Sequence, residues 1–117
     1  MSKFTICRTA AGYKFDLRAD NGQVVATSEV YATLAACRRG LASVRRNAPI
    51  AGVEEGSALP HPKFQVYQDR AGEYRFRLKA ANGRVIGASE GYVSKAGCLA
   101  GVERVKKAAQ EAAVDEL

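Results

Sequence analysis

Few residues in this sequence are of the types that carry out acid–base or nucleophilic chemistry. The single histidine, His61, lies between Pro60 and Pro62 in a stretch with the composition of a loop, which is a poor place to hold a general base in a fixed position. No Ser/His/Asp or Cys/His arrangement can be assembled around it, and the sequence has neither a glycine-rich phosphate loop nor a metal-ligand spacing. The sequence therefore predicts no enzymatic activity and no catalytic, cofactor-binding or metal-binding residue.

One short polar segment, with the pattern Ser-Glu-x-Tyr, occurs twice. If a two-fold axis pairs the two segments, their carboxylate, hydroxyl and phenol groups would line a symmetric cleft. The alternative is structural, because a glutamate near a helix N-terminus suits the helix dipole and a tyrosine just ahead of an N-cap can pack on the core. We favour the structural interpretation and keep the cleft as a hypothesis. The residues concerned are Ser28, Glu29, Tyr31, Ser89, Glu90 and Tyr92.

Basic residues alternate with apolar residues along one expected strand in each half of the chain. Side chains two apart on a strand are spaced by about 7 Å, comparable to neighbouring phosphates along a nucleic-acid strand. The face is otherwise explained as a solvated sheet surface kept polar by charge, and no aromatic platform that could stack bases is evident on it apart from Tyr67. The candidate contacts for nucleic acid or an acidic partner are Lys14, Arg18, Arg75, Arg77 and Lys79.

The three cysteines, Cys7, Cys37 and Cys98, form an odd set with no CxxC spacing. Neither a disulfide framework nor a zinc site is indicated. Cys37 and Cys98 fall on the apolar stripes of two expected helices, so we expect free thiols that act as small buried hydrophobic residues.

Composition and charge place the chain among globular proteins with a basic surface. The 117 residues are 47% hydrophobic and carry a formal net charge of +6, which favours acidic proteins or nucleic acid as partners. No apolar run is long enough to span a bilayer, and the N-terminus has no stretch of signal-peptide type. We therefore expect no membrane contact and a cytoplasmic location.

The dominant feature of the sequence is an internal repeat. Lys3-Phe4 matches Lys63-Phe64 at an offset of 60, and the inserted Glu73 then moves the offset to 61. We expect the insertion to lengthen a hairpin turn. The residues that recur at the second offset are Tyr13, Phe15, Leu17, Ala19, Asn21-Gly22, Val24, Ser28-Glu29, Tyr31, Cys37, Gly40 and Val44, as Tyr74, Phe76, Leu78, Ala80, Asn82-Gly83, Val85, Ser89-Glu90, Tyr92, Cys98, Gly101 and Val105.

Each copy predicts three strands followed by a helix. Apolar and polar residues alternate around residues 3–6 and 13–19, and the Asn-Gly pair that follows is typical of a hairpin with a type I′ turn. Thr33 and Ser94 are suitable N-caps for the helices. Gly40 and Gly101 lie inside those helices, where glycine costs about 1 kcal/mol relative to alanine. Their recurrence indicates close approach of each helix to the sheet or to its twin.

These elements predict one compact α+β domain over residues 1–117. Two β-β-β-α units would share one largely antiparallel sheet with two helices packed on it, related by a pseudo-two-fold axis in a monomer, because one unit alone would bury too little apolar surface. The expected boundaries are repeat 1 at 3–47, a linker at 48–62, repeat 2 at 63–108 and a helical tail at 109–117. A short strand around Ile50–Val53 is an alternative for part of the linker.

Two segments of the second copy, Tyr74–Gly83 and Ser89–Cys98, resemble the YegP-like family, a bacterial domain family of unknown function. The first copy departs from that pattern at Asp20, Val30, Leu34 and Ala36. The resemblance covers nearly the whole chain except the linker and the last ten residues. It implies tandem three-strand-plus-helix units that assemble one sheet and single-copy members that do the same by dimerising, and it leaves open whether strands are exchanged between the units. It implies no particular activity.

Two classes of function are open from the sequence. The first is a non-catalytic interaction or accessory module that acts through protein contacts. The second is a weak, sequence-independent nucleic-acid binder that uses the basic strand face and basic helix residues such as Arg38, Arg39, Arg45 and Arg46.

Overall fold

Each half of the chain runs through three strands, a helix and a further strand in the same order. The computed structural model describes residues 1–116. The first half contains β1 (Lys3–Thr9), β2 (Gly12–Arg18), β3 (Val24–Thr27), α1 (Leu34–Asn47) and β4 (Gly52–Glu54). The second half contains β5 (Lys63–Gln68), β6 (Tyr74–Lys79), β7 (Val85–Ala88), α2 (Lys95–Glu111) and β8 (Ala113–Glu116).

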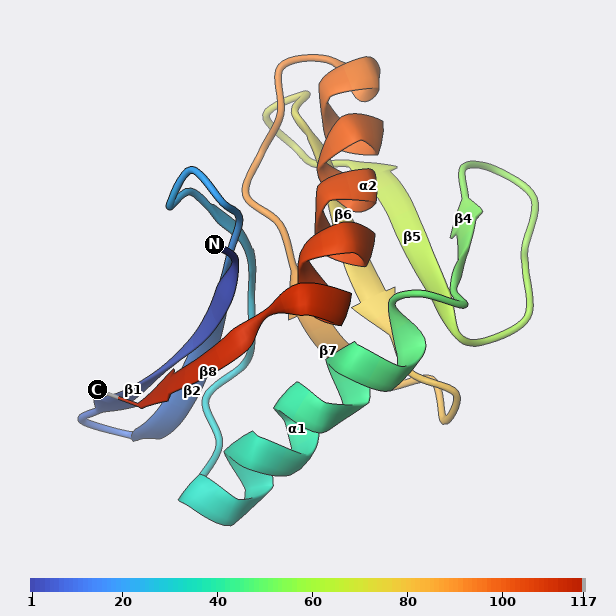
Figure 1. Ribbon diagram of the computed structural model, residues 1–117. Coiled ribbons are helices and arrows are strands. Elements are labelled where there is room, and N and C mark those ends of the chain that lie inside the picture. The colour runs from blue at the N-terminus through green and yellow to red at the C-terminus, as the bar shows by residue number, and fades with distance from the viewer. Residues whose placement is uncertain (117) are drawn as a thin grey trace.

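All eight strands form one mixed sheet, in the order β4-β5-β6-β7-β3-β2-β1-β8. Both helices lie on the same side of it (Figure 1). The strand pairs are antiparallel except for the two outermost, β4 with β5 and β8 with β1, which are parallel. The α+β class, the single sheet and the two helices agree with the expectation from the sequence.

The strand that follows each helix leaves its own half of the molecule. β4, which follows α1, pairs with β5, and β8, which follows α2, pairs with β1 (Figure 1). The strands are therefore exchanged between the two halves, a point that the sequence left open. The repeating unit has five elements, so the expected four-element β-β-β-α unit was one strand too short.

The expected helical tail over 109–117 is wrong beyond Glu111. The backbone becomes extended at Ala112 (φ −64°, ψ 131°), and Ala113–Glu116 then form β8, while residue 117 lies outside the described residues. Nothing in the local sequence breaks the helix. The open edge of β1 offers backbone hydrogen-bonding partners that outweigh the modest helix propensity of the segment.

The core lies between the sheet and the helices. Four phenylalanines at matching positions are almost completely buried and form two edge-to-face pairs, Phe4 with Phe15 and Phe64 with Phe76, each with ring centroids 5.8 Å apart. The helices contribute the apolar stripes that the sequence predicted. Their largest fully buried side chains are those of Cys37, Val44, Cys98, Val102 and Val105.

The Asn-Gly hairpins are confirmed, but their turn type is not. Only the glycines have positive φ, 83° at Gly22 and 84° at Gly83, and no other residue type does so within residues 1–116. The Gly22 N–H donates to the Ala19 carbonyl, and the pairing register shifts just before Arg18. This is the three-residue loop in which a type I turn precedes a left-handed glycine, a geometry that needs only one residue of positive φ.

The inserted Glu73 lengthens its hairpin as predicted. In the first half Thr9 pairs directly with Gly12, which leaves a two-residue turn. In the second half the Asp69 N–H donates to the Glu73 carbonyl at 2.8 Å, and residues 70–72 form the loop.

Thr33 and Ser94 cap their helices as expected, and each side-chain oxygen accepts a hydrogen bond from the third following amide. The helix glycines face a neighbour that the sequence did not identify. A Cβ at Gly40 would lie 2.2 Å from the Tyr31 hydroxyl, and one at Gly101 would lie 2.4 Å from the Tyr92 hydroxyl. The close approach is to a tyrosine of the Ser-Glu-x-Tyr segment, not to the sheet backbone or the other helix.

Apart from the exchanged strands β4 and β8, the two halves touch only briefly within the sheet, because β3 and β7 pair at Thr27 and Ala88 alone. Side chains from the helices join them more extensively. Arg45 of α1 donates to the Ala112 carbonyl at 2.5 Å, at the C-terminal end of α2, where a cation is favourable. Its counterpart Lys106 donates to the Ala51 carbonyl at 2.7 Å.

Candidate functional site

The serines of the duplicated segment are used to hold the backbone. Ser28 Oγ accepts a hydrogen bond from the Phe15 N–H at 2.9 Å and donates to the Glu29 carbonyl at 2.7 Å. Ser89 Oγ makes the same pair of bonds with Phe76 and Glu90, at 2.9 and 2.8 Å. Each hydroxyl therefore joins the middle of a strand to the loop that precedes the helix.

The tyrosines of the segment pack on the core. Tyr31 exchanges backbone hydrogen bonds with Tyr13, and its ring stacks on Phe15 with an interplanar angle of 12°. Tyr92 does the same with Tyr74 and Phe76. These contacts are those of the structural interpretation.

The two Ser-Glu-x-Tyr segments do not meet in one cleft. β3 and β7 run antiparallel and pair through their last residues, so the segments that follow them leave the junction in opposite directions. Glu29 and Tyr31 line a hollow on the helix side, whereas Ser89 and Glu90 line a separate groove that also contains Lys14, Asp16 and Arg75.

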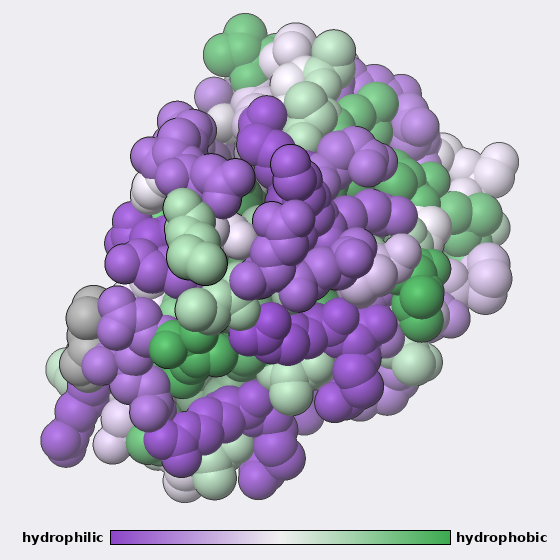
Figure 2. All heavy atoms as spheres, viewed as in Figure 1, coloured by the Kyte–Doolittle hydropathy of each residue, from purple (hydrophilic) through white to green (hydrophobic). Residues whose placement is uncertain are grey.

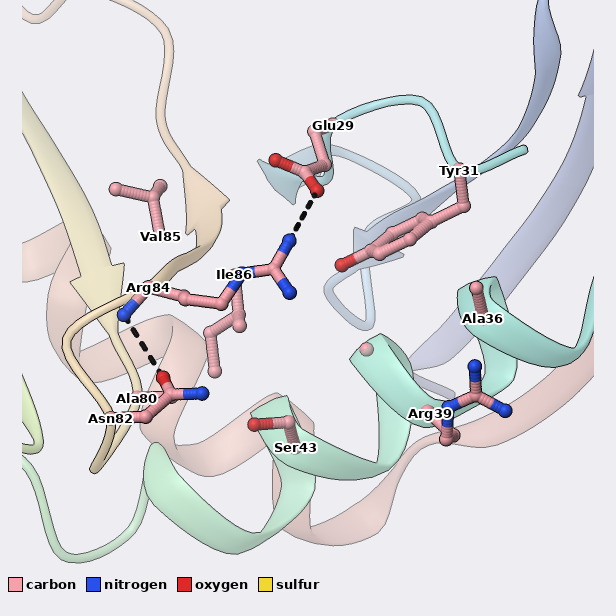
Figure 3. A pocket seen from close by; sticks show the side chains of 11 residues that line it. Glu29, Tyr31, Ala36, Arg39, Ser43, Ala80, Asn82, Arg84, Val85 and Ile86 are labelled. Carbon is pink, nitrogen blue, oxygen red and sulfur yellow. Dashed lines mark hydrogen bonds and ion pairs between the residues drawn. The ribbon is translucent and has the colours of Figure 1, made fainter. Parts of the chain in front are cut away.

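The hollow on the helix side has a volume of about 280 Å³ and crosses the boundary between the halves. The first half contributes the Glu29–Tyr31 loop and one side of α1, and the second half contributes the turn between β6 and β7 with the start of β7 (Figure 3). We call it the boundary hollow. Its polar lining residues are Glu29, Tyr31, Arg39, Ser43, Asn82 and Arg84, and its apolar lining residues include Ala36, Val85 and Ile86.

Charge in the boundary hollow is unevenly matched. Arg84 lies 3.4 Å from Glu29, and both side chains are well exposed. Arg39 makes no ion pair and no side-chain hydrogen bond within the described part of the chain. Two guanidinium groups and one carboxylate therefore line the hollow, and the carboxylate contacts only Arg84, while Arg39 lies on the α1 side (Figure 3).

The Tyr31 hydroxyl points toward the Arg84 guanidinium, and Arg39 lies apart from both on α1 (Figure 3). Burial raises the pKa of Tyr31, and the nearby Glu29 carboxylate raises it further, while Arg84 acts weakly in the opposite direction. The hydroxyl therefore keeps its proton at neutral pH and has no hydrogen-bond partner among residues 1–116. It is available as a donor to a ligand.

The two arginines of the boundary hollow are not repeated in the other half of the sequence. At the offset of 61, Arg84 corresponds to Gln23, Arg39 to Ala100 and Ser43 to Arg104. A hollow of about 250 Å³ does lie near Asn21 and Arg104, but there Asp20 and Glu111 stand beside the basic residues. Sequence reasoning did not single out Arg84. The sequence does carry a signal for it. Arg84 differs from its counterpart Gln23, although the residues on either side of it are the same in both halves.

The five basic strand residues share the face of the sheet opposite the helices. Most of their side chains are already engaged in ion pairs or hydrogen bonds within the protein. Lys14 lies 3.4 Å from Asp16, and Arg75 lies 2.7 Å from Asp69. Arg77 donates to Gln65 at 2.8 Å and lies over the Tyr67 ring, 4.5 Å from its centroid. The Tyr67 face is thus covered by a guanidinium group. Of the remaining two, Arg18 donates to the Gly22 carbonyl at 3.1 Å, and Lys79 has no partner within the described residues.

An ion pair buried at one edge of this face orders the start of the second half. Lys63 Nζ lies 2.6 Å from Glu54 Oε1, which also accepts the Leu59 N–H at 2.9 Å. The hydrogen bond from Lys63 is the largest cause that lowers the pKa of Glu54 to about 2, followed by those from Leu59 and Gln65. The expected linker is therefore anchored by β4 and this carboxylate.

The cysteines are free, and Cys37 and Cys98 are fully buried. Burial raises the pKa of both thiols. Within residues 1–116 no group of three or more His, Cys, Asp or Glu side chains could hold a metal ion, and no helix in this part of the chain is long and apolar enough to cross a membrane. Figure 2 shows that hydrophilic side chains cover most of the helix side.

This architecture defines a class of protein in which two β-β-β-α-β units exchange their last strands to build one sheet. The chain belongs to the family described as "Domain of unknown function (DUF1508)", whose model matches residues 9–55 and again residues 69–116. The matched ranges include all of β4 and all of β8. The resemblance to the YegP-like family is thereby confirmed.

Relatives and solved structures agree with this assignment. A UPF0339 protein of Pseudomonas aeruginosa is 35% identical over 98% of this chain and 96% of its own length. The solution structure of YegP from E. coli, titled a protein of unknown function, has a TM-score of 0.84 at 28% identity, over 98% of this chain and 91% of that one. A UPF0339 protein of Treponema denticola is 56% identical over 55 residues, which cover 95% of that protein but 47% of this chain. That relative has about the length of one unit.

Proposed function

We propose that this protein is a non-catalytic interaction module of the cytoplasm that binds an acidic segment of a partner protein in the boundary hollow. The observation that carries the proposal is the unequal charge of the hollow, which Arg39 and Arg84 line together with a single exposed carboxylate. Arginine is well suited to carboxylate recognition because its planar guanidinium donates two parallel hydrogen bonds.

Other contacts support a binding role over a catalytic one. The serine hydroxyls of the duplicated segment are engaged with backbone groups on both sides. The buried thiols of Cys37 and Cys98 have raised pKa values, so they are not activated nucleophiles.

The test is a titration of the protein with a capped acidic peptide, in which isothermal calorimetry measures the affinity at low and at moderate salt. Arg84→Gln should weaken binding at least fivefold, because it removes a charge from the hollow. Arg70→Gln is the matched control, since Arg70 is exposed in the β5–β6 turn and lies outside the hollow. Equal affinities for both variants and the wild type would refute the proposed site.

A second candidate function, weak binding of nucleic acid, is favoured by one observation. The side chains of Arg18 and Lys79 lie on the sheet face that no helix covers, and neither is in an ion pair within the described residues. Contacts of this kind are made to phosphates without regard to sequence, so affinity for generic DNA and RNA should fall steeply with salt. Absence of binding in a low-salt series would remove this candidate.

A further inference from the structure

We propose that Arg39 and Arg84 form a two-point site, in which each arginine binds one carboxylate of a ligand that carries two. This inference rests on the proposed function and specifies its ligand. The ligand is an acidic peptide stretch with two glutamate or aspartate side chains. We further propose that the chain carries one such site and not two, despite its internal repeat.

The geometry of the boundary hollow favours a ligand with two anionic groups. Arg84 lines the hollow from the β6–β7 turn and Arg39 lines it from α1, and the Tyr31 hydroxyl is directed toward Arg84 (Figure 3). A single carboxylate at one guanidinium leaves the other guanidinium without a counter-charge. At about 280 Å³ the space is near the lower limit for ligand pockets, which suits two side chains and the backbone between them.

Glu29 occupies the place that a ligand carboxylate would take at Arg84. Its contact with Arg84, at 3.4 Å, is between two exposed side chains, and such pairs contribute little to stability. A ligand carboxylate can therefore replace Glu29 at small cost. Glu29 is thus a competitor for Arg84, and its negative charge also repels the ligand.

The other half of the molecule lacks the charges that the site needs. Gln23 and Ala100 stand where Arg84 and Arg39 stand in the boundary hollow. Arg104, at the position of Ser43, lines a different hollow, where Asp20 and Glu111 balance it. The backbone that frames both sites is the same, since the hairpin registers and the tyrosine bridges match in the two halves. The difference between the sites therefore lies in these side chains.

The first experiment uses calorimetry with a capped seven-residue peptide that contains two glutamates separated by one alanine. Its counterparts with one or two glutamines, inorganic phosphate and a ten-nucleotide oligothymidine are titrated in parallel. We expect one peptide per chain, a loss of at least tenfold in Arg39→Ala and in Arg84→Gln, and a comparable loss when either glutamate becomes glutamine. Glu29→Gln should bind about threefold to tenfold more tightly, whereas a purely structural role of Glu29 would leave affinity unchanged or lower.

The second experiment transfers the site to the other half. Gln23→Arg, Ala100→Arg and Arg104→Ser together reproduce the polar lining of the boundary hollow. Circular dichroism with thermal unfolding checks that the fold is kept. We expect two peptides per chain. A stoichiometry that stays at one in the folded variant would overturn the assignment.

The results of these titrations also distinguish a failure of this inference from a failure of the proposed function. If the wild type binds acidic peptides but Arg39→Ala and Glu29→Gln bind as the wild type does, the two-point site is wrong while the interaction module stands. Failure of the wild type to bind any acidic peptide would overturn both. Tighter binding of phosphate or oligothymidine than of the peptide would overturn the carboxylate assignment and favour nucleic acid.

Discussion

Substitution of Gly40 by alanine tests whether the helix glycines exist to admit the tyrosine hydroxyls. The added Cβ would lie 2.2 Å from the Tyr31 hydroxyl oxygen and 2.6 Å from Cζ. Ordinary van der Waals contacts begin at about 3.4 Å. The Tyr31 ring would therefore have to move by about 1 Å. It has little freedom to do so, because it stacks on Phe15 and its backbone is bonded to Tyr13.

Two opposing effects set the size of the change in the free energy of unfolding. Alanine in place of glycine in a helix interior stabilises by about 1 kcal/mol, whereas overpacking of a filled site costs about 1–3 kcal/mol. Gly40→Ala should therefore destabilise the protein by about 1 kcal/mol, which lowers the melting temperature by about 4 °C for a chain of this size. Urea unfolding monitored by circular dichroism measures the change in free energy of unfolding.

The sign of the effect should reverse when the tyrosine is removed. In a Tyr31→Leu background, Gly40→Ala should stabilise the protein by about 1 kcal/mol, because only the propensity term remains. Ala35→Gly, at an exposed position of the same helix, calibrates that term. The reasoning is refuted if Gly40→Ala is stabilising in the wild-type background, or if it has the same effect in both backgrounds.

Three further outcomes are expected. Cys37 and Cys98 should resist alkylation without denaturant, because both are fully buried, and rapid labelling of both, detected by mass spectrometry, would contradict the helix assignment. The pKa of Glu54 is lowered from 4.5 to about 2 in the folded protein. The contribution of this carboxylate to stability is therefore present above pH 4.5 and is lost as the pH falls toward 2. Between about pH 7 and 2.5, the free energy of unfolding of Glu54→Gln, measured from unfolding curves, should fall less steeply with decreasing pH than that of the wild type. Replacing Arg75, Arg77 and Lys79 together by alanine should reduce any affinity for oligonucleotides and its salt slope, and a fluorescence-anisotropy salt series with unchanged slope would exclude that face.

The repeat and its local patterns predicted most of the individual elements. Alternation placed the strands, and good N-caps placed the helix starts at Thr33 and Ser94, because these features depend on neighbouring residues. The lengthened hairpin at Glu73 followed from an insertion between two aligned strands. These are local relations, which a single sequence expresses directly.

The strand exchange could not be read in the same way. Alternation tells which face of a strand is buried but not which strand lies beside it. The offset of 61 does continue past α1, since Val53 corresponds to Val114 and Glu54 to Asp115, so the repeat could have been extended to include β4 and β8. Their pairing with the opposite half depends on where open edges lie in three dimensions.

The candidate site was missed for a related reason. Repeat analysis selects residues that are the same in both halves, and the structure uses several of these, such as Ser28 and Tyr31, for packing and backbone bonds. The unbalanced charges come from positions that differ between the halves, Arg39 and Arg84. The loss of repeat identity marks such positions in the sequence, but only the structure shows that Arg39 and Arg84 line one hollow.

The exchange of β8 onto β1 also bears on how the chain folds as it is made. Lys3 of β1 pairs with Ala113 of β8, so the two partners are 110 positions apart in the sequence. While the ribosome is still synthesising the second unit, β1 has an unpaired edge and its sheet is incomplete. The first half cannot reach its final state until the last described strand has left the exit tunnel. Such non-local pairing slows folding and leaves the edge of β1 open to pairing with other chains until β8 has been synthesised.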